Sequence, residues 1–435
     1  MSLDPSQLME FIFSFTIVRD FWPFWVFIIF FLFARSSWLA YVQECFKRGI
    51  TWTTFELRIP REILKNPRAM EQIFMTIHGV RNSPSSIKEK WWQGEVTMWF
   101  SCEMVSFGGE IHLFIRVPEK HRNIIESGFY AQYPDVELKE VTEDYIDRLP
   151  PTTKELFAAG YDFFGNELKL AKHDAYPIRT YMDFQENEED YQLDPIGVLL
   201  ETLSKCKPQE HLWIQIIIQP VDDSWRKKGE LLVKEIKEKV GRRQLKTTLG
   251  EFVVIDRSPG ELEVLKAVER NIAKPGFNTI IRYLFIGPKE TLDEGYGRRG
   301  VFSAFNQYAS AATNKFAHNT KAWTRISFWY PPYIFPGLRK RARKARIYKN
   351  YRTRKIEDET LIGKFARFQF FDWGFAARRQ GKMVLNVEEL ATIFHPPMAV
   401  VLTGPLIKRV EARRVGPPAG LPIYGEKGEG LLEDQ

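Results

Sequence analysis

The chain has 435 residues, which is enough for two or three domains. Because 44% of the residues are hydrophobic and 14% are aromatic, it can bury real cores, and global disorder is excluded. The formal net charge of +7 has a local origin, since without the ten cations between Gly337 and Lys355 it would be −3. This distribution predicts an exposed basic patch on a protein that is otherwise not cationic.

Residues 21–42 predict a transmembrane helix. The run FWPFWVFIIFFLFA carries no charge, and the apolar character resumes after Arg35 as far as Val42. At about 1.5 Å per residue, this segment would cross a hydrocarbon core of about 30 Å. Aromatic residues at its two ends fit the two interfacial belts, and an arginine near one end can snorkel to the nearer interface. The predicted anchor residues are Trp22, Trp25, Arg35, Trp38 and Tyr41.

The alternative for this segment is a cleaved signal peptide. The length, the bulky side chains and the lack of a small-x-small cleavage site argue against it. Basic residues are sparse before the segment and frequent after it, at Lys47, Arg48, Arg58, Arg61, Lys65 and Arg68. The positive-inside rule therefore predicts a single-pass protein of the cytoplasmic membrane. Residues 1–20 would form a short extracytoplasmic N-terminus, and the bulk of the chain would be cytoplasmic.

Residues 51–146 predict a first α+β domain. Alternating apolar segments, a proline-started helix at 67–80 and a Gly108-Gly109 hairpin turn give the order β-α-β-β-α-β. This is the order of a ferredoxin-like split βαβ unit.

Residues 175–335 predict a second, looser α+β domain. Strands are expected at 177–184, 211–220 and 277–287, and helices at 195–206, 222–240, 259–274 and 297–316. Ser258 and Glu261 form a capping box at the start of one of these helices. The predicted fold class is therefore α+β, with two tandem ferredoxin-like domains that each carry helices on one face of a sheet.

Residues 337–355 predict a basic helix, because Leu338, Ala342, Ala345 and Tyr348 recur at helical spacing among the cations. Three interpretations remain open: a solvated helix, a surface for nucleic acid, and a surface for anionic lipid. Tyr348 and Tyr351 could stack on bases in the second of these. The candidate binding residues are Arg298, Arg299, Arg339, Lys340, Arg341, Arg343, Lys344, Arg346, Lys349, Arg352, Arg354 and Lys355.

The sequence offers no catalytic constellation. GYGRRG at 295–300 matches GxGxxG, but seven residues separate it from the preceding strand, which does not suit dinucleotide binding. There is no P-loop motif, the histidines are scattered, and the three cysteines lack CxxC spacing, with Cys102 and Cys206 expected as inert core residues. We therefore expect no enzyme activity, no cofactor and no metal.

The C-terminal part predicts one short helix and a tail. At 383–395, Asn386 and Glu389 have capping-box spacing before a His-Pro-Pro stop. Residues 396–435 are rich in Pro, Gly and charge and predict an extended tether.

Several segments resemble a known family. They are FELRIPREILKNPRAMEQIFMTIHGV, GGEIHLFIRVPEKHRNIIESGFYAQYPDVEL, GRRGVFSAFNQYASAATNKF and VEELATIFHPP. Together with the apolar span, they resemble the N-terminal region of coupling-type ATPases of conjugative type IV secretion from candidate-phyla-radiation bacteria. In that family the region precedes a motor that pumps DNA.

The printed sequence departs from that family because it reaches Gln435 without a Walker motif. The resemblance therefore implies a membrane-anchored, non-enzymatic scaffold of a DNA-transfer machine, with a separate P-loop motor and DNA as partners. The alternative is a membrane-organising protein whose basic helix binds lipid headgroups and has no role with nucleic acid. The sequence leaves oligomerisation open.

Overall fold

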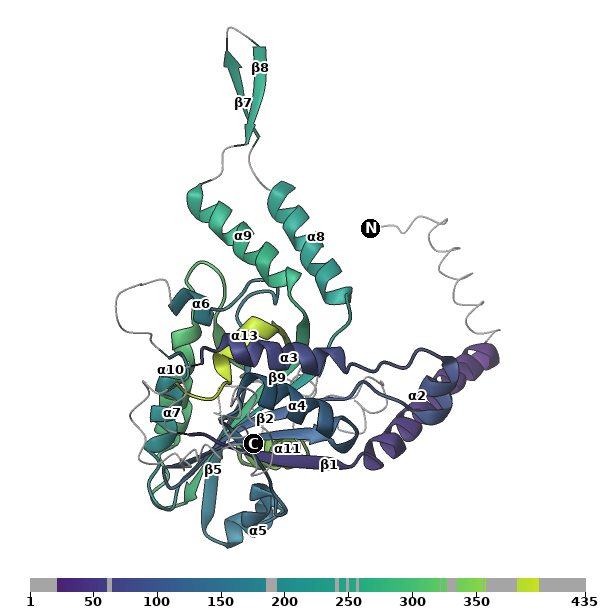
Figure 1. The fold of residues 1–435 in the computed structure, drawn as a ribbon. Coiled ribbons are helices and arrows are strands. Elements are labelled where there is room, and N and C mark those ends of the chain that lie inside the picture. Colours follow the sequence, from purple (N-terminus) through teal and green to yellow (C-terminus); the bar gives the residue numbers. More distant parts are fainter. Residues whose placement is uncertain are drawn as a thin grey trace, which may run out of the picture.

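One sheet of antiparallel strands forms the centre of the protein (Figure 1). The computed structural model describes residues 22–60, 65–184, 194–238, 258–320, 322–326, 335–354, 356 and 382–398, together with the backbone of a hairpin at 242–247 and 250–255. Within these residues the central sheet has nine strands, in the order β10-β5-β9-β6-β2-β3-β1-β4, with β11 also paired to β9. The fold is therefore mixed α+β, as the sequence predicts.

The first half of the sheet has the predicted order of elements. They are β1 (Trp52–Arg58), α3 (Arg68–Gly79), β2 (Phe100–Phe107), β3 (Glu110–Pro118), α4 (Arg122–Gln132) and β4 (Glu137–Glu140). The strands lie in the order β2-β3-β1-β4. Gly108 and Gly109 join β2 to β3 with φ of 57° and 97°, the left-handed backbone that a tight hairpin turn requires.

The second half differs from its prediction at both ends. Its elements are β5 (Tyr161–Leu170), α7 (Gly197–Ser204), β6 (His211–Pro220), α8 (Ser224–Glu238), α9 (Pro259–Ala273), β9 (Gly276–Pro288), α10 (Val301–Phe305) and β10 (Phe316–His318). The first strand is β5, which lies before the predicted boundary at residue 175. The predicted strand at 177–184 is wrong, because its last four residues form the short helix α6 (Tyr181–Phe184).

The predicted helix at 297–316 is also much shorter than expected. It is divided into η4 (Tyr296–Gly300), α10 and η5 (Asn306–Tyr308), and its last residue begins β10. The capping box of Ser258 and Glu261 at the start of α9 is confirmed.

The two halves share one sheet. Strands β2 and β6 pair antiparallel along their length, from Phe100 opposite Ile218 to Phe107 opposite His211. The two domains expected from the sequence are therefore two halves of a single sheet, joined through the β2–β6 pair.

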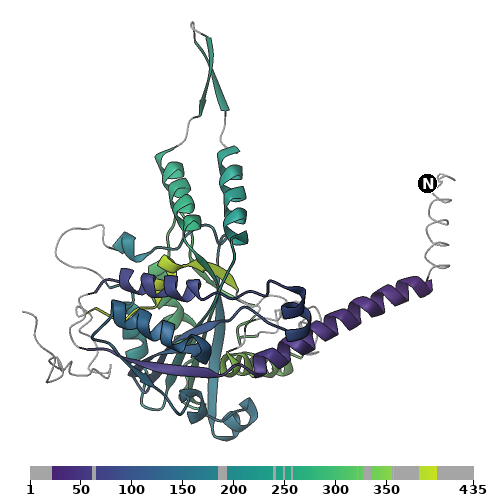
Figure 2. The ribbon, with the colours of Figure 1, turned by 45° about the vertical axis from the view of Figure 1, so that its right-hand side comes forward.

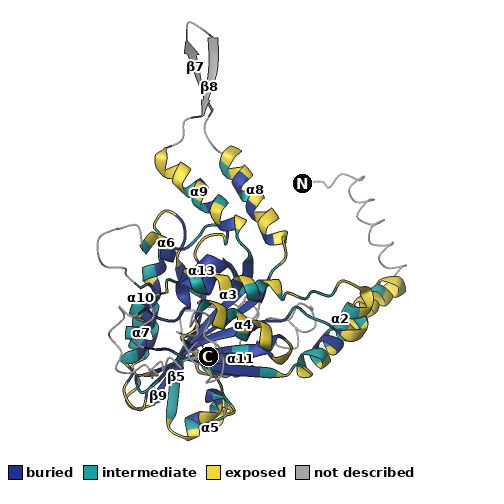
Figure 3. Cartoon of the chain, in the orientation of Figure 1, coloured by how far each residue is buried: buried dark blue, intermediate teal, exposed yellow. Residues whose placement is uncertain are grey.

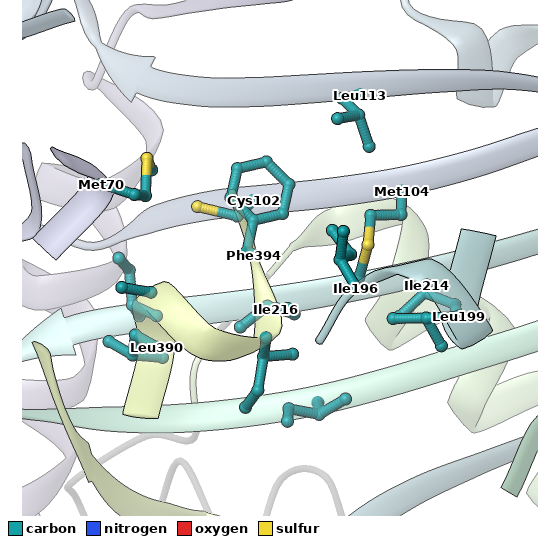
Figure 4. Close-up of a cluster of buried hydrophobic side chains, with 14 of the residues drawn as sticks. Met70, Cys102, Met104, Leu113, Ile196, Leu199, Ile214, Ile216, Leu390 and Phe394 are labelled. Atoms are coloured by element: carbon teal, nitrogen blue, oxygen red, sulfur yellow. The ribbon is translucent and has the colours of Figure 1, made fainter. Parts of the chain in front are cut away.

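Helices cover both faces of this sheet, so the expectation of helices on one face only is wrong. On the first face, α3, α4, α7, α10 and α13 contribute to the largest apolar core. Figure 4 shows part of it, where Cys102 and Met104 of β2 lie beside Leu199, Leu390 and other aliphatic side chains. The second face is covered by α5 (Thr153–Ala158), η3 (Tyr145–Arg148) and α11 (Pro336–Thr353), whose Ile347, Tyr348 and Tyr351 belong to a second core.

Two helical features extend from this body (Figures 1 and 2). The helix α2 (Trp22–Arg48) lies on one side, and the antiparallel pair α8 and α9 projects from the sheet with the hairpin β7 (Arg242–Thr247) and β8 (Gly250–Ile255) beyond it. Figure 3 shows that α2 is largely exposed, whereas the inner strands of the central sheet are mostly buried. We call α8 and α9 with their hairpin the projecting arm.

The predicted C-terminal helix begins with a strand. β11 (Met383–Asn386) pairs with β9, and α13 (Val387–Ile393) follows with the predicted capping box of Asn386 and Glu389. Every residue of α13 is buried, and burial continues to Met398, so the start of the predicted tail packs into the body. Residues 399–435 of that tail and the predicted N-terminus at 1–20 lie outside the described residues.

Candidate functional site

The helix α2 exposes the apolar side chains that the sequence assigns to a membrane span. It has 27 residues and, among the described helices, is the one long and apolar enough to cross a bilayer. Its exposed large apolar residues are Trp22, Phe24, Trp25, Val26, Phe27, Ile29, Phe30, Phe31, Leu32, Phe33, Trp38 and Tyr41. Burial begins only at Val42 and Gln43, where the helix meets the body. All five predicted anchor residues, Arg35 included, are thus exposed.

The basic helix predicted at 337–355 forms as α11, but most of its length packs onto the sheet. The expectation of an exposed strip is wrong for four of its cations, which are buried: Arg339, Arg343, Lys344 and Arg354. Tyr348 and Tyr351, considered above for base stacking, are also buried. The Tyr348 hydroxyl donates to the Pro150 carbonyl at 2.6 Å, and the Tyr351 hydroxyl lies 3.0 Å from that of Tyr145.

The cations of α11 are held by partners within the protein. Lys344 Nζ lies 2.5 Å from Asp162 Oδ1, and Lys340 Nζ lies 2.9 Å from Glu294 Oε1. Burial lowers the pKa of Lys344, and its hydrogen bond and charge interaction with Asp162 offset part of that shift.

The arginines of α11 make comparable contacts. Arg343 donates to the carbonyls of Thr320 and Trp323 at 3.0 and 3.3 Å. Arg352 Nη2 lies 2.9 Å from Asp147 Oδ1. These groups therefore fix the helix to loops and strands of the body.

A row of polar side chains under α11 is the feature that the sequence analysis missed. Glu103 of β2 lies opposite Gln215 of β6, Gln215 opposite Arg282 of β9, and Arg282 opposite Glu167 of β5. All four are at most 2% exposed. We call this set the buried polar row. It crosses the junction between the two halves, and it was detectable in principle because each of these four largely apolar strands carries a charged or amide side chain in its interior.

The buried polar row binds α11 through its side chains. Gln215 Nε2 donates to Glu103 Oε1 at 3.0 Å and to the Tyr351 carbonyl at 3.1 Å. Arg282 Nε lies 2.7 Å from Glu167 Oε1, and its Nη1 donates to the Asn350 carbonyl at 3.1 Å. Buried polar groups are stable only when their hydrogen bonds are satisfied, so this row specifies where the helix docks.

Arg354 closes the row at the end of α11. Its Nε and Nη2 donate to the two carboxylate oxygens of Glu103 at 2.6 and 2.7 Å, and its guanidinium also pairs with Asp144. Burial alone would raise the pKa of Glu103, but the charge and hydrogen bonds of Arg354 outweigh it and lower that pKa to about 2. Arg354 has a φ of 47°, in the left-handed region that a non-glycine residue rarely occupies.

The remaining predicted cations are Arg298, Arg299, Arg341, Arg346, Lys349 and Lys355. Arg341 and Lys349 are exposed on the outer side of α11, and Arg346 is half-buried. Arg298 and Arg299 lie in η4, on the face of the sheet opposite α11. Arg298 is half-buried and Arg299 is exposed. Lys355 lies outside the described residues. The structure thus leaves Arg299, Arg341 and Lys349 as fully exposed cations of the predicted set.

The GYGRRG segment packs against the sheet. Gly297 is buried, and a Cβ there would lie 3.0 Å from Phe285 Cδ1, so close approach to β9 accounts for a glycine at this position. Cys102 and Cys206 are buried, and burial raises the pKa of both thiols above the ordinary value. Among the described residues, no group of three or more His, Cys, Asp or Glu side chains is placed to hold a metal.

A cavity of about 560 Å³ lies between α6, α9, residues 309–313 and the start of α13. The cavity wall includes Glu388, whose two oxygens each lie 2.9 Å from Arg270 Nη2. Glu388 Oε2 also lies 2.7 Å from Lys274 Nζ, and Glu71 pairs with the same lysine at 2.6 Å. These charges compensate one another, and the cluster fastens α13 to α3 and α9.

A family model matches residues 42–403, which is most of the chain. The chain belongs to the DUF8128 family. The family is described as a domain of unknown function. The matched segment begins at Val42, where α2 first becomes buried, and it includes both halves of the sheet, α11 and α13. No curated protein matches the chain.

Proposed function

We propose that this DUF8128 protein is a non-enzymatic scaffold that α2 anchors in the cytoplasmic membrane. The observation that carries the proposal is the row of exposed apolar side chains between Trp22 and Tyr41. Contiguous apolar surfaces of this extent on soluble proteins are rare, because they favour association or membrane contact. The 20 residues from Trp22 to Tyr41, at about 1.5 Å each, match a hydrocarbon core of about 30 Å.

The basic residues that follow the span support a cytoplasmic body and an extracytoplasmic N-terminus. Cys45 offers a test, because it is the exposed member of the three cysteines and lies just beyond the buried Val42. A membrane-impermeant maleimide should label Cys45 in inverted vesicles and not in intact spheroplasts. Labelling in spheroplasts would reverse the topology.

The body suits a duplicated scaffold. Each half has the strand order and the antiparallel pairing expected of a split βαβ unit, β2-β3-β1-β4 and β6-β9-β5-β10. This supports two ferredoxin-like units that are joined through their corresponding edge strands. The projecting arm is inserted between β6 and β9 of the second unit, which would place it for contact with a protein partner.

The resemblance to the N-terminal region of coupling-type ATPases supports a DNA-transfer machine of the type IV secretion kind as the setting. In this proposal the partner of the scaffold is a motor ATPase, and oligomers of the scaffold could surround it. DNA contact would involve the exposed cations Arg299, Arg341 and Lys349, since most of the basic helix is occupied by internal partners. Anionic lipid would compete for the same three side chains.

The anchor is tested with charged substitutions in α2. The double substitution Ile29→Lys and Phe33→Lys replaces two exposed side chains, and each lysine near the middle of a span disfavours insertion by about 2.5–3.5 kcal/mol. After carbonate extraction, the variant should be found in the soluble fraction and no longer with the membranes. Leu231→Lys on α8 is the matched control, because Leu231 is an exposed aliphatic residue of the projecting arm, away from α2. If the α2 variant stays with the membranes, the anchor proposal is overturned.

DNA contact is tested with the full chain in nanodiscs of neutral lipid. Arg341→Glu with Lys349→Glu should weaken DNA retardation, while Lys227→Glu with Lys234→Glu on α8 makes the same charge change at exposed control positions. Binding should also fall steeply with salt, because phosphate contacts release counterions. Equal retardation of both variants would remove the DNA claim. If the wild type binds DNA in neutral nanodiscs but not in nanodiscs of anionic lipid, the cations face the membrane.

A further inference from the structure

A short turn of the body lies against α2 (Figures 1 and 2). Tryptophans of this turn contact the helix. We call residues 85–93 the tryptophan turn; it includes η1 (Glu89–Gln93). The Trp38 indole Nε1 donates to the Trp91 carbonyl at 2.7 Å, and the Trp38 and Trp92 rings meet edge to face at 5.8 Å. The Arg35 guanidinium lies 4.7 Å from the centre of the Trp91 ring.

The tryptophan turn exposes side chains that a soluble loop would bury. Ile87 is 77% exposed and Trp92 is 70% exposed, although Trp92 contacts Trp38 of α2. Together with Arg35, Trp38 and Trp91, they line an open hollow of about 570 Å³. An isolated exposed aromatic residue is ordinary, but this group is continuous with the exposed apolar surface of α2.

The turn is fixed in shape by hydrogen bonds to its own backbone. The Glu89 carboxylate accepts from the amides of Ser85 and Ser86 at 2.7 and 3.2 Å, and the Ser86 hydroxyl accepts from the Glu89 amide at 3.1 Å. Gly94 then approaches α2 so closely that a Cβ would lie 2.2 Å from the Val42 carbonyl oxygen. The turn and the helix therefore have a defined relative position, and the apolar side chains are held outward.

The position of the turn along α2 sets its depth in a membrane. Val42 and Gln43 of the helix are buried against the body, so its lipid-embedded part ends before Val42. Trp38 precedes Val42 by one helical turn, about 5.4 Å along the axis. A side chain in contact with Trp38 consequently lies at the boundary between headgroups and acyl chains, where tryptophan is enriched in membrane proteins.

We propose that Ile87, Trp91 and Trp92 insert into the headgroup–acyl boundary of the bilayer next to α2, as a second membrane contact. This inference rests on the proposed anchor. Lipid is the occupant because the hollow is continuous with the span, and because the exposed Lys88 and Lys90 flank the apolar side chains as cations that pair with lipid phosphates. Two contacts in one leaflet would fix the tilt and rotation of the body relative to the membrane.

The test places a polarity-sensitive probe on the turn in the full chain. Ile87→Cys and Trp92→Cys are made in a Cys45→Ser background, since Cys102 and Cys206 are buried, and each is labelled with an NBD fluorophore. Val198→Cys on α7 is the control, because it is also an exposed aliphatic position and α7 lies across the body from α2 (Figure 1). The proteins are reconstituted into vesicles of zwitterionic and anionic phospholipid, with or without a lipid that carries a nitroxide at the top of its acyl chain.

Insertion predicts a blue-shifted NBD emission at positions 87 and 92 and loss of that emission with the nitroxide lipid, with neither change at position 198. A protein that floats with the vesicles but keeps water-like emission at 87 and 92 would overturn the second contact and leave the anchor intact. A blue shift without nitroxide quenching would also overturn it, because a protein surface would then cover the turn. A protein that does not float would overturn the anchor and the second contact together.

Discussion

Glu103 and Arg354 form a buried, two-point ion pair although 251 positions separate them in the sequence. Glu103 lies on β2 at the junction of the two halves, and Arg354 directly follows α11. The pair therefore joins the last turn of the basic helix to the centre of the sheet. Several measurable consequences depend on this contact and its neighbours.

Removing one partner of this ion pair should destabilise the protein strongly. Glu103→Ala leaves the buried Arg354 guanidinium with Asp144 as its remaining carboxylate partner, and removing one partner of a buried ion pair costs about 3–5 kcal/mol. Urea unfolding in detergent, followed by tryptophan fluorescence, measures the change. The control is Glu230→Ala, which breaks the exposed Arg226–Glu230 pair of 3.1 Å on α8 and should change stability by less than about 1 kcal/mol. Similar losses in the two variants would contradict a structural role for the buried pair.

The same pair should make stability depend on acid. The pKa of Glu103 is about 2 in the folded protein, below its ordinary value of 4.5. Its contribution is therefore complete above about pH 4.5 and is lost as the pH falls towards 2. Glu103→Gln should be less stable at neutral pH, and its free energy of unfolding should fall less between pH 4.5 and 3 than that of the wild type. Parallel pH profiles would show that Glu103 does not carry this dependence.

Cations on the two sides of α11 should respond differently to substitution. Lys344→Ala removes a buried ammonium and leaves Asp162 without its 2.5 Å partner, so a loss of about 1–3 kcal/mol is expected. Lys349→Ala removes an exposed cation from the same helix and should change stability by no more than about 0.5 kcal/mol. Thermal unfolding of the two variants in parallel tests this. Equal destabilisation would mean that α11 is packed differently.

Gly165 of β5 should not tolerate a side chain. A Cβ at this position would lie 2.7 Å from Leu284 Cδ2 and 3.2 Å from Ile347 Cδ1, so Gly165→Ala forces the sheet and α11 apart. Overpacking of this kind costs about 1–3 kcal/mol. Gly260→Ala, in the first turn of α9, meets nothing within 4 Å and should be neutral or slightly stabilising. The denaturant midpoint should fall for Gly165→Ala and should stay the same or rise slightly for Gly260→Ala. An unchanged midpoint for Gly165→Ala would contradict the close packing.

Thiol labelling should distinguish the three cysteines. Cys45 is exposed, whereas Cys102 and Cys206 are buried, and burial raises the pKa of Cys206 to about 12. Thiolate is the reactive form, so a maleimide should modify one cysteine in the folded protein and all three after denaturation. Mass spectrometry identifies the modified residue. Rapid native labelling of Cys102 would show that the first core is open.

The fold class and most elements of the sheet were predictable from the sequence. Local signals sufficed where apolar alternation and capping coincided, as at β3, β6 and α9. The strand β5 was missed because FFGNEL does not alternate cleanly: Asn166 and Glu167 are both buried, one on each face of the sheet.

The candidate site was harder to predict than the fold. The helical spacing of apolar residues indicates a helix at 337–355. It cannot indicate that the partners of Lys344 and Arg354 are Asp162, Asp144 and Glu103, which come from distant segments. The polar residues inside β2, β6 and β9 become meaningful only once their register places them in one row.

The shared β2–β6 pair means that neither half is a natural unit for expression. A fragment that ends before β6 would leave β2 with an unpaired edge. A fragment that begins after β4 would leave the ten mostly apolar residues of β6 with an unpaired edge. Such edges recruit other strands, so truncated chains should aggregate or dimerise through them. Dissection of this family should keep the two halves on one polypeptide and remove the projecting arm or the apolar helix instead.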